Sequence, residues 1–280
     1  MTCDRKREFN FTDKEFKFLT ELVFNKTGIV LKNSKFEMVY SRLARRLRKL
    51  GLNKFKEYVQ LLQGSKGEDE LAYLVDAITT NLTKFFRESH QFKDLIKNVL
   101  DQAIEAAKAG KPRKLRIWSA GCSGGQEAYS LAMILASYIK DFQNWDVMIL
   151  ASDIDRNMLN KGREAIYSVE ELESLPENFS KRFVSKDKYG QFSIDPELRK
   201  IVHFKSLNLL HEWPMKSKFD AIFCRNVVIY FDNETKEDLV SRFSDKLKNN
   251  GMLYLGHSES AIGINESLTL AGRASFRKVS

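Results

Sequence analysis

The second half of this chain alternates between short apolar runs and helical segments, and no other feature constrains the fold as strongly. The apolar runs occupy residues 115–119, 147–152, 219–224 and 252–255. Such alternation predicts a parallel sheet with helices packed on its faces. Two further short strands, near residues 268–270 and 275–279, predict an antiparallel hairpin at the edge of that sheet.

Residues 12–78 instead predict a small helical domain. Two capping boxes of the Ser/Thr-x-x-Glu type begin apolar runs with helical periodicity. The boxes pair Thr12 with Glu15 and Ser34 with Glu37. Gly28 and Gly51 are expected to end the two helices. The residues expected in their apolar faces are Phe16, Leu19, Val23, Val39, Leu43, Leu47 and Leu50.

Length and composition agree with two domains. A chain of 280 residues with 43% hydrophobic content can bury one sizeable core and one smaller core. No apolar run approaches the roughly 20 residues that span a bilayer, and the first residues lack the apolar core of a signal peptide. We therefore expect a cytoplasmic protein without membrane insertion. Cys3, Cys122 and Cys224 are widely spaced, which predicts reduced thiols and neither a disulfide framework nor a metal site.

The formal charge of +9 is concentrated in part of the chain. Residues 1–84 carry 17 Lys and Arg against 11 Asp and Glu. Five of the eight residues in 42–49 are cationic and none is acidic, so no ion pairs between residues four apart relieve their repulsion. This basic stripe, which includes Arg42, Arg45, Arg46 and Lys49, favours an acidic partner. The alternative is an ordinary charged face that keeps a surface helix in water.

Residues 79–88, with the sequence TTNLTKFFRE, fit neither an amphipathic helix nor an alternating strand. We interpret this decapeptide as a binding surface. The alternative is a connection in which Thr and Asn satisfy the backbone groups of a loop. A long helix follows, which is expected to end at Gly110 and Pro112 and to link the two domains.

A glycine-rich turn, residues 119–127 with the sequence SAGCSGGQE, joins the first strand of the sheet to a helix. Glycines at the carboxyl edge of a sheet let a ligand approach the backbone. The spacing is not Gly-x-Gly-x-x-Gly, which disfavours a nicotinamide cofactor. Glu127 and Asp153 place carboxylates at this edge, where they could accept hydrogen bonds from hydroxyl and ammonium groups of a ligand. For Asp153 the alternative is the cap of the next helix.

Two further segments complete the pattern. Residues 219–231, FDAIFCRNVVIYF, run from a strand into an Arg-Asn step and then an aromatic pair, at the edge where α/β sheets bind ligands. Between the second and third apolar runs, residues 182–184, 191–194 and 201–204 alternate with turns and predict a small antiparallel insertion.

Taken in order, the decapeptide, the glycine turn and the segment CRNVVIYF resemble the chemotaxis receptor glutamate O-methyltransferases, the CheR family. The resemblance implies an α/β, Rossmann-like methyltransferase domain with a mixed seven-stranded sheet, a small all-α N-terminal domain and a small antiparallel β insertion. It implies receptor docking by residues 1–84, a signature segment and linker helix at 85–112, and a methyltransferase domain at 113–280 with the insertion at 166–204.

The resemblance also implies S-adenosylmethionine as cofactor and S-adenosylhomocysteine as product. The residues that match the family's cofactor contacts are Asn81, Thr83, Arg87, Glu127, Asp153, Asn208, Leu209, Asn226 and Val227. Arg87 and Tyr230 would lie nearest the transferred methyl group and act by positioning. Arg42, Arg45, Arg46 and Lys49 would dock on the acidic methylation helices of the receptor, and the insertion could hold a tethering peptide from the receptor's C-terminus.

Two other functions would also account for parts of the sequence. A nucleic-acid methyltransferase would suit the basic charge, but its Asn/Asp-Pro-Pro-aromatic motif is replaced by residues 226–229, and the Pro-Cys nucleophile of cytosine enzymes is missing at Cys224. No motif that reads RNA accompanies the charge, so nucleic acid is not expected as a partner. A binding module without activity, which senses the cofactor, is the other alternative. We expect a monomer in which His257 is not a base.

Overall fold

The structure, a computed structural model, describes residues 7–65, 67–79 and 81–279 and divides into two compact units. The first unit is Met1–Thr80 with Tyr230–Asp232, and the second is Asn81–Ile229 with Asn233–Ser280. The division falls four residues before the boundary expected at residue 84. Cys3 and Thr80, which were part of the predictions above, lie outside the described residues.

The first unit is helical. Its helices are α1 (Asp13–Thr27), α2 (Phe36–Leu50), α3 (Phe55–Gln63) and α4 (Gly67–Ile78), with a 3-10 turn at Asn33–Lys35. Its core contains the predicted apolar faces of the first two helices, and Leu19, Val23, Val39, Leu43 and Leu47 are fully buried.

The first predicted capping box is confirmed and the second is wrong. The backbone N–H of Thr12 donates to Glu15 Oε2 at 2.8 Å, while Ser34 lies in the 3-10 turn that precedes α2. The helix begins two residues later, where Phe36 packs its ring on those of Phe11 and Phe16. The carboxylate of Glu37 consequently pairs with Arg7 instead of the helix start.

The main sheet of the second unit has seven strands in the order β6-β2-β1-β7-β8-β10-β9. They are β1 (Lys114–Ala120), β2 (Asp146–Asp153), β6 (Val202–Ser206), β7 (Phe219–Cys224), β8 (Leu247–Leu255), β9 (Leu268–Gly272) and β10 (Ser275–Lys278). The first five in this order are parallel, and β10 runs antiparallel to both of its neighbours. The mixed sheet and its edge hairpin are therefore confirmed.

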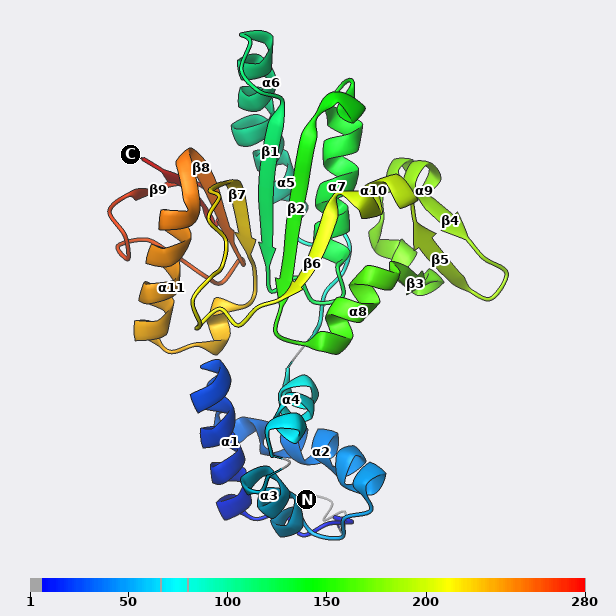
Figure 1. The fold of residues 1–280 in the computed structure, drawn as a ribbon, viewed down its shortest axis with the longest axis vertical. Coiled ribbons are helices and arrows are strands. Elements are labelled where there is room, and N and C mark those ends of the chain that lie inside the picture. Colours follow the sequence, from blue (N-terminus) through cyan, green and yellow to red (C-terminus); the bar gives the residue numbers. More distant parts are fainter. Residues whose placement is uncertain (1–6, 66, 80, 280) are drawn as a thin grey trace, which may run out of the picture. The chain divides into compact units, whose positions relative to one another are not determined.

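Helices cover both faces of this sheet (Figure 1). The helices of the second unit are α5 (Ser89–Leu95), α6 (Asp101–Lys108), α7 (Gln126–Tyr138), α8 (Arg156–Glu164), α9 (Glu177–Phe183), α10 (Pro196–Lys200) and α11 (Asn233–Lys246). Short 3-10 helices occupy Phe142–Asn144, Val169–Ser174 and Val228–Tyr230. On one face α5 and α7 pack in the core, and on the other Trp118 of β1 contacts Phe243 of α11. Within the described chain no helix combines the length and the apolar character needed to cross a membrane.

The helix expected to link the domains belongs to the second unit. It consists of α5, a π-helical turn at Ile96–Leu100, and α6. Phe92, Leu95 and Leu100 are buried in the same core as residues of β1 and β7. The helix therefore covers the sheet and helps to close its core.

The antiparallel insertion is present, but two of its predicted runs were wrong. Residues 182 and 183 end α9, and only Val184 of that run is in a strand. The insertion contains β3 (Ile166–Ser168), β4 (Val184–Lys186) and β5 (Gln191–Ile194), in the order β3-β5-β4. Residues 201–204, assigned to the insertion by their alternation, instead belong to β6 of the main sheet. Val202 and Phe204 are buried there, and the strand pairs in parallel with β2. A short alternating run fits a strand of either sheet equally well, so the sequence alone did not show which sheet it joins.

Candidate active site

The glycine-rich turn carries the chain from the end of β1 into α7. Gly121 and Gly125 have φ angles of 80° and 90°, a region that favours glycine. A Cβ on Gly121 would lie 2.3 Å from Cγ2 of Val227 in the loop after β7. Only glycine lets these two loops approach each other at the carboxyl edge of the sheet.

Asp153, at the end of β2, holds this turn in place. Its Oδ2 accepts the backbone N–H of Ser123 at 2.8 Å, and its Oδ1 accepts that of Asp155 at 2.9 Å. Burial raises the pKa of the Asp153 carboxyl, although these hydrogen bonds oppose the shift. The alternative role of Asp153 as a helix cap is wrong, because Asp155 caps α8 by accepting from Asn157 and Met158.

The polar part of the decapeptide forms hydrogen bonds to the glycine-rich turn after β1 and to the loop after β2. Asn81 Nδ2 donates to Asp155 Oδ2 at 2.6 Å, and the carbonyl oxygen of Asn81 accepts from Ser123 Oγ at 3.4 Å. Thr83 follows two residues later and is half-buried. Asn81 therefore bonds to the same two residues, Ser123 and Asp155, whose backbone N–H groups Asp153 accepts, and its contact with the cofactor stays a prediction.

The aromatic pair of the decapeptide has a different role from the one expected. Phe85 is buried, and its ring packs on Tyr167 and Phe192 of the insertion. Phe86 packs on Phe92 and Phe179. Interpreting this part as a binding surface is wrong, because the two rings anchor the segment in the core and leave its polar residues at the loops.

A buried charged cluster lies at the start of α7. Glu127 Oε1 accepts the hydroxyl of Ser119 at 2.6 Å, and Glu127 Oε2 lies 3.4 Å from Nε of Arg225. Burial raises the pKa of Glu127, and the positive charge of Arg225 partly offsets this shift. Arg225 Nε also lies 3.9 Å from a carboxylate oxygen of Glu88.

Arg225 was not among the predicted site residues. Its side chain is only 3% exposed, and its Nη2 donates to the carbonyl oxygen of Arg87. Its Nε and Nη1 have no hydrogen-bond partner within the described residues. A buried guanidinium with unused donors beside Glu127 and Arg87 is available to an anionic group of a ligand. The signal in the sequence was its position directly before Asn226.

Glu259 was not among the predicted site residues either. Its carboxylate accepts the backbone N–H groups of Asn226 at 2.9 Å, of Ile229 at 3.0 Å, and of Gly256. Burial raises the pKa of the Glu259 carboxyl, although these three hydrogen bonds oppose the shift. Asn226 adopts a left-handed conformation with φ of 59°, so the carboxylate stabilises a loop that is unfavourable by itself.

Asn208 and Leu209 lie in the loop after β6, beside the end of β2. The backbone N–H of Leu207 donates to the carbonyl oxygen of Asp153 at 3.0 Å. Asn208 Oδ1 accepts the N–H of Leu210 at 3.0 Å, and Leu209 is buried. This loop thus borders the same edge of the sheet as Asp153.

The remaining predicted residues lie in the first unit. Tyr230 belongs there by its contacts, and its role stays a prediction. Arg42 Nη1 donates to the carbonyl oxygens of Ile78 and Thr79 at the end of α4. Arg42 thus donates hydrogen bonds to carbonyl groups at the C-terminal end of a helix, which have no partner within the helix.

The idea of an unpaired arginine face is also wrong for Arg46. This side chain makes two hydrogen bonds to the buried carboxylate of Glu70, at 2.8 and 2.6 Å, and lies over the ring of Tyr73. Arg45 and Lys49 are exposed. Docking therefore stays a prediction, and these two exposed cations are the ones free to serve it.

The donor set at the sheet edge fits S-adenosylmethionine. Asp153 and Glu127 offer carboxylates for ribose hydroxyls and an ammonium group, and Arg87 and Arg225 offer guanidinium groups for a carboxylate. Residues 81–275 match the family described as CheR methyltransferase, SAM binding domain, and residues 14–79 match CheR methyltransferase, all-alpha domain. The chain belongs to the CheR methyltransferase family. The boundary between the two matches coincides with the division between the two units.

Curated relatives agree over nearly the whole chain. The chemotaxis protein methyltransferase of Borreliella burgdorferi is 39% identical over 271 residues, which cover 96% of this chain and 95% of the relative. The chemotaxis protein methyltransferase of Escherichia coli is 39% identical over 270 residues, covering 95% of this chain and 91% of the relative. This CheR methyltransferase accordingly uses S-adenosylmethionine as its cofactor.

Proposed function

We propose that this CheR methyltransferase methylates glutamate side chains of chemoreceptors to γ-glutamyl methyl esters during chemotactic adaptation. The observation that carries the proposal is the match of both CheR domains, together with relatives called chemotaxis protein methyltransferase. S-adenosylhomocysteine would be the product.

The reaction needs no base from the protein. The cofactor supplies a methyl group on a positively charged sulfur. A glutamate with an ordinary pKa of about 4.3 is already ionised at neutral pH and attacks as a carboxylate. The chain's residues therefore act mainly by alignment, which can contribute about 7–11 kcal/mol in well-oriented systems.

The contacts of individual residues support a role for each. Asp153 would accept hydrogen bonds from ribose hydroxyls, and Glu127 would receive the ammonium group. Arg87 would grip a carboxylate, either of the cofactor or of the substrate. The bond from Arg225 to the carbonyl oxygen of Arg87 supports this assignment, because it fixes the backbone from which Arg87 extends. Asn226 and Val227 would contact the cofactor from the loop that Glu259 holds.

The proposal includes the receptor as a docking partner. Exposed cations on α2, Arg45 and Lys49, suit acidic methylation helices. β4 is an edge strand of the three-stranded insertion, and an extended receptor peptide could pair with such an edge. A receptor fragment ending in its own C-terminal segment should then bind more tightly than one without it, and equal affinities would remove the peptide from the proposal.

The test is a methyl-transfer assay. The full chain is incubated with methyl-labelled S-adenosylmethionine and membranes containing chemoreceptors, and the product is treated with mild base. We expect volatile labelled methanol, because carboxyl methyl esters hydrolyse in base. Label that resists base, or transfer to nucleic acid instead of receptor, would contradict the proposal. Cofactor binding without any transfer would favour a binding module.

Tyr230 has a separate test. Replacing Tyr230 with Phe removes only the hydroxyl, so we expect lower turnover with unchanged affinity for S-adenosylhomocysteine if the hydroxyl positions the reactants. Turnover equal to that of the unchanged protein would reduce Tyr230 to a packing residue.

A further inference from the structure

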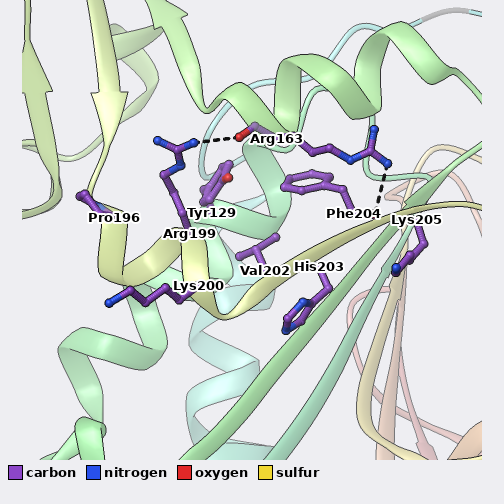
Figure 2. A pocket seen from close by; sticks show the side chains of 9 residues that line it. All are labelled: Tyr129, Arg163, Pro196, Arg199, Lys200, Val202, His203, Phe204 and Lys205. Atoms are coloured by element: carbon purple, nitrogen blue, oxygen red, sulfur yellow. Dashed lines mark hydrogen bonds between the residues drawn. The ribbon is translucent and has the colours of Figure 1, made fainter.

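A basic pocket lies at the edge strand β6 of the main sheet, in the second unit. It has a volume of about 430 Å³ and lies between α10, α8 and β6 (Figure 2). Its cationic lining consists of Arg163, Arg199, Lys200 and Lys205, with the His203 side chain beside them, and none of its described lining residues is acidic. Neither CheR methyl transfer nor receptor docking, as proposed above, uses this pocket.

The two arginines are held in place by neutral acceptors. Arg199 Nη2 donates to the carbonyl oxygen of Arg163 at 3.1 Å, and Arg163 Nη2 donates to the carbonyl oxygen of Phe204 at 3.2 Å, as Figure 2 shows. Arg163 Nη1 donates to Oδ1 of Asn160 at 2.7 Å. These hydrogen bonds orient the guanidinium groups without neutralising their charge.

The charges of Arg163, Arg199 and Lys205 are not balanced locally. Within the described chain no carboxylate lies at ion-pair distance from any of the three. Lys200 differs, because its Nζ pairs with the carboxylate of Glu197 at 2.6 Å. Three uncompensated cations around one hollow favour an anion with more than one negative charge.

One wall of the pocket is apolar and buried. Tyr129, Val202 and Phe204 are buried, and a Cβ on Gly162 would lie 2.3 Å from the Phe204 ring. The Tyr129 hydroxyl donates to the carbonyl oxygen of Gly162 at 2.8 Å. The volume of the pocket falls in the range of small-molecule sites.

We propose that this pocket binds a small polyphosphate group carrying two or more negative charges. Planar guanidinium groups suit phosphate oxygens, and the oriented pair of Arg163 and Arg199 would make the main contacts. Lys205 would add charge at the rim. The ligand is either a free polyphosphate or a nucleoside phosphate, since both present the same group.

The test uses pyrophosphate and ATP as probes, with the cofactor site filled by S-adenosylhomocysteine so that adenosine cannot compete. Binding is measured by calorimetry at low salt. We expect both probes to bind, with adenosine inactive. Tighter binding of ATP would point to a nucleoside phosphate, and equal binding to a free polyphosphate. The double variant Arg163→Gln/Arg199→Gln should weaken binding at least about tenfold, the ratio that corresponds to one strong hydrogen bond.

Two controls make the result specific. Lys200→Gln removes a lining charge that Glu197 already balances and should weaken binding less than Lys205→Gln does. Lys188→Gln removes the same charge on the β4–β5 turn, outside the pocket, and should leave binding unchanged. Because the double variant loses structural hydrogen bonds, Lys205→Gln also serves as the test if that variant does not fold.

The proposal would be overturned by any of three results. These are the absence of binding by both probes, binding that no lining variant changes, and binding of a glutamate-rich peptide where neither phosphate compound binds. The last result would identify an acidic protein surface as the occupant instead.

Discussion

The carboxylate of Glu259 accepts the backbone N–H of Asn226 at 2.9 Å and thereby holds a loop at the edge of the sheet in a left-handed conformation. The same carboxylate accepts from Ile229 and Gly256, so one buried side chain connects the ends of β7 and β8. The loop carries Asn226 and Val227, which are expected to contact the cofactor.

Replacing Glu259 with Gln should weaken cofactor binding. The amide of Gln offers one acceptor oxygen, and its NH₂ group would face a backbone N–H, leaving a buried donor unsatisfied at a cost of about 1–3 kcal/mol. We expect affinity for S-adenosylhomocysteine, measured by calorimetry, to fall at least about tenfold. Glu266→Gln, an exposed change of the same kind, should leave it unchanged. Equal affinities in both variants would contradict a positioning role for Glu259.

Replacing Gly121 with Ala should abolish cofactor binding. The added Cβ would meet Val227 at 2.3 Å and push apart the loops after β1 and β7. Gly110→Ala is the matched control, because Gly110 has a similar φ of 86° but open space around it. The control should lose only the left-handed cost of about 1–2 kcal/mol, seen in thermal unfolding, and keep its affinity for S-adenosylhomocysteine. Similar binding by the two variants would show that the loops can separate without harm.

The sheet could be predicted from sequence because its signal is local. Apolar runs of strand length between helical segments mark β1, β2, β7 and β8, and the helical faces of α1 and α2 follow from periodicity. Residues 201–204 were assigned to the wrong sheet because alternation of apolar and polar residues predicts a strand but not the strand with which it pairs. The pairing with β2 depends on residues about fifty positions away.

The candidate site was predictable only in part, for the same reason. Asp153 and Glu127 stand at the ends of recognisable elements. Arg225 and Glu259 contact partners that are distant in sequence, namely Glu127 and Asn226. Their burial depends on the whole fold. The pairing of Arg46 with Glu70 likewise spans 24 residues, so a stripe of arginines that looks unpaired in sequence is not unpaired in the structure.

Cofactor affinity should fall on acidification earlier than ordinary carboxyl groups would allow. Burial raises the pKa of both Glu127 and Asp153 on folding. Their contribution to the free energy of unfolding is therefore fully present in acid, below their unfolded pKa values, and is lost as pH rises through the folded ones. Cofactor binding instead requires the ionised forms of Glu127 and Asp153, because the carboxylates are the hydrogen-bond acceptors.

The measurement is affinity for S-adenosylhomocysteine from about pH 8 down to pH 5, a range in which exposed carboxyl groups stay ionised. We expect a progressive loss of affinity toward the acid end. The variant Asp153→Asn should bind weakly throughout and show a flatter profile, because one titrating group is gone. An affinity that stays constant over this range in the unchanged protein would show that neither carboxyl is protonated there.

Two neighbouring arginines of α2 should differ strongly in how their substitution affects stability. Arg46→Met would leave the buried carboxylate of Glu70 without its cation, and removing one partner of a buried pair typically costs about 3–5 kcal/mol. We expect a marked fall in the thermal stability of the helical unit. Arg45→Met, at an exposed position one residue earlier, should change the free energy of unfolding by no more than about 0.5 kcal/mol.

Receptor docking is therefore best tested at the exposed cations. The double variant Arg45→Glu/Lys49→Glu should keep the stability of the protein and its affinity for S-adenosylhomocysteine, yet methylate receptors much more slowly, because its charge would repel acidic methylation helices. Raising the salt concentration should slow the unchanged protein and affect the variant less, since salt screens exposed charges. If the double variant methylates receptors at the original rate, α2 does not dock through these cations, whereas a loss seen only in variants of Arg42 or Arg46 would reflect damage to the helical unit itself.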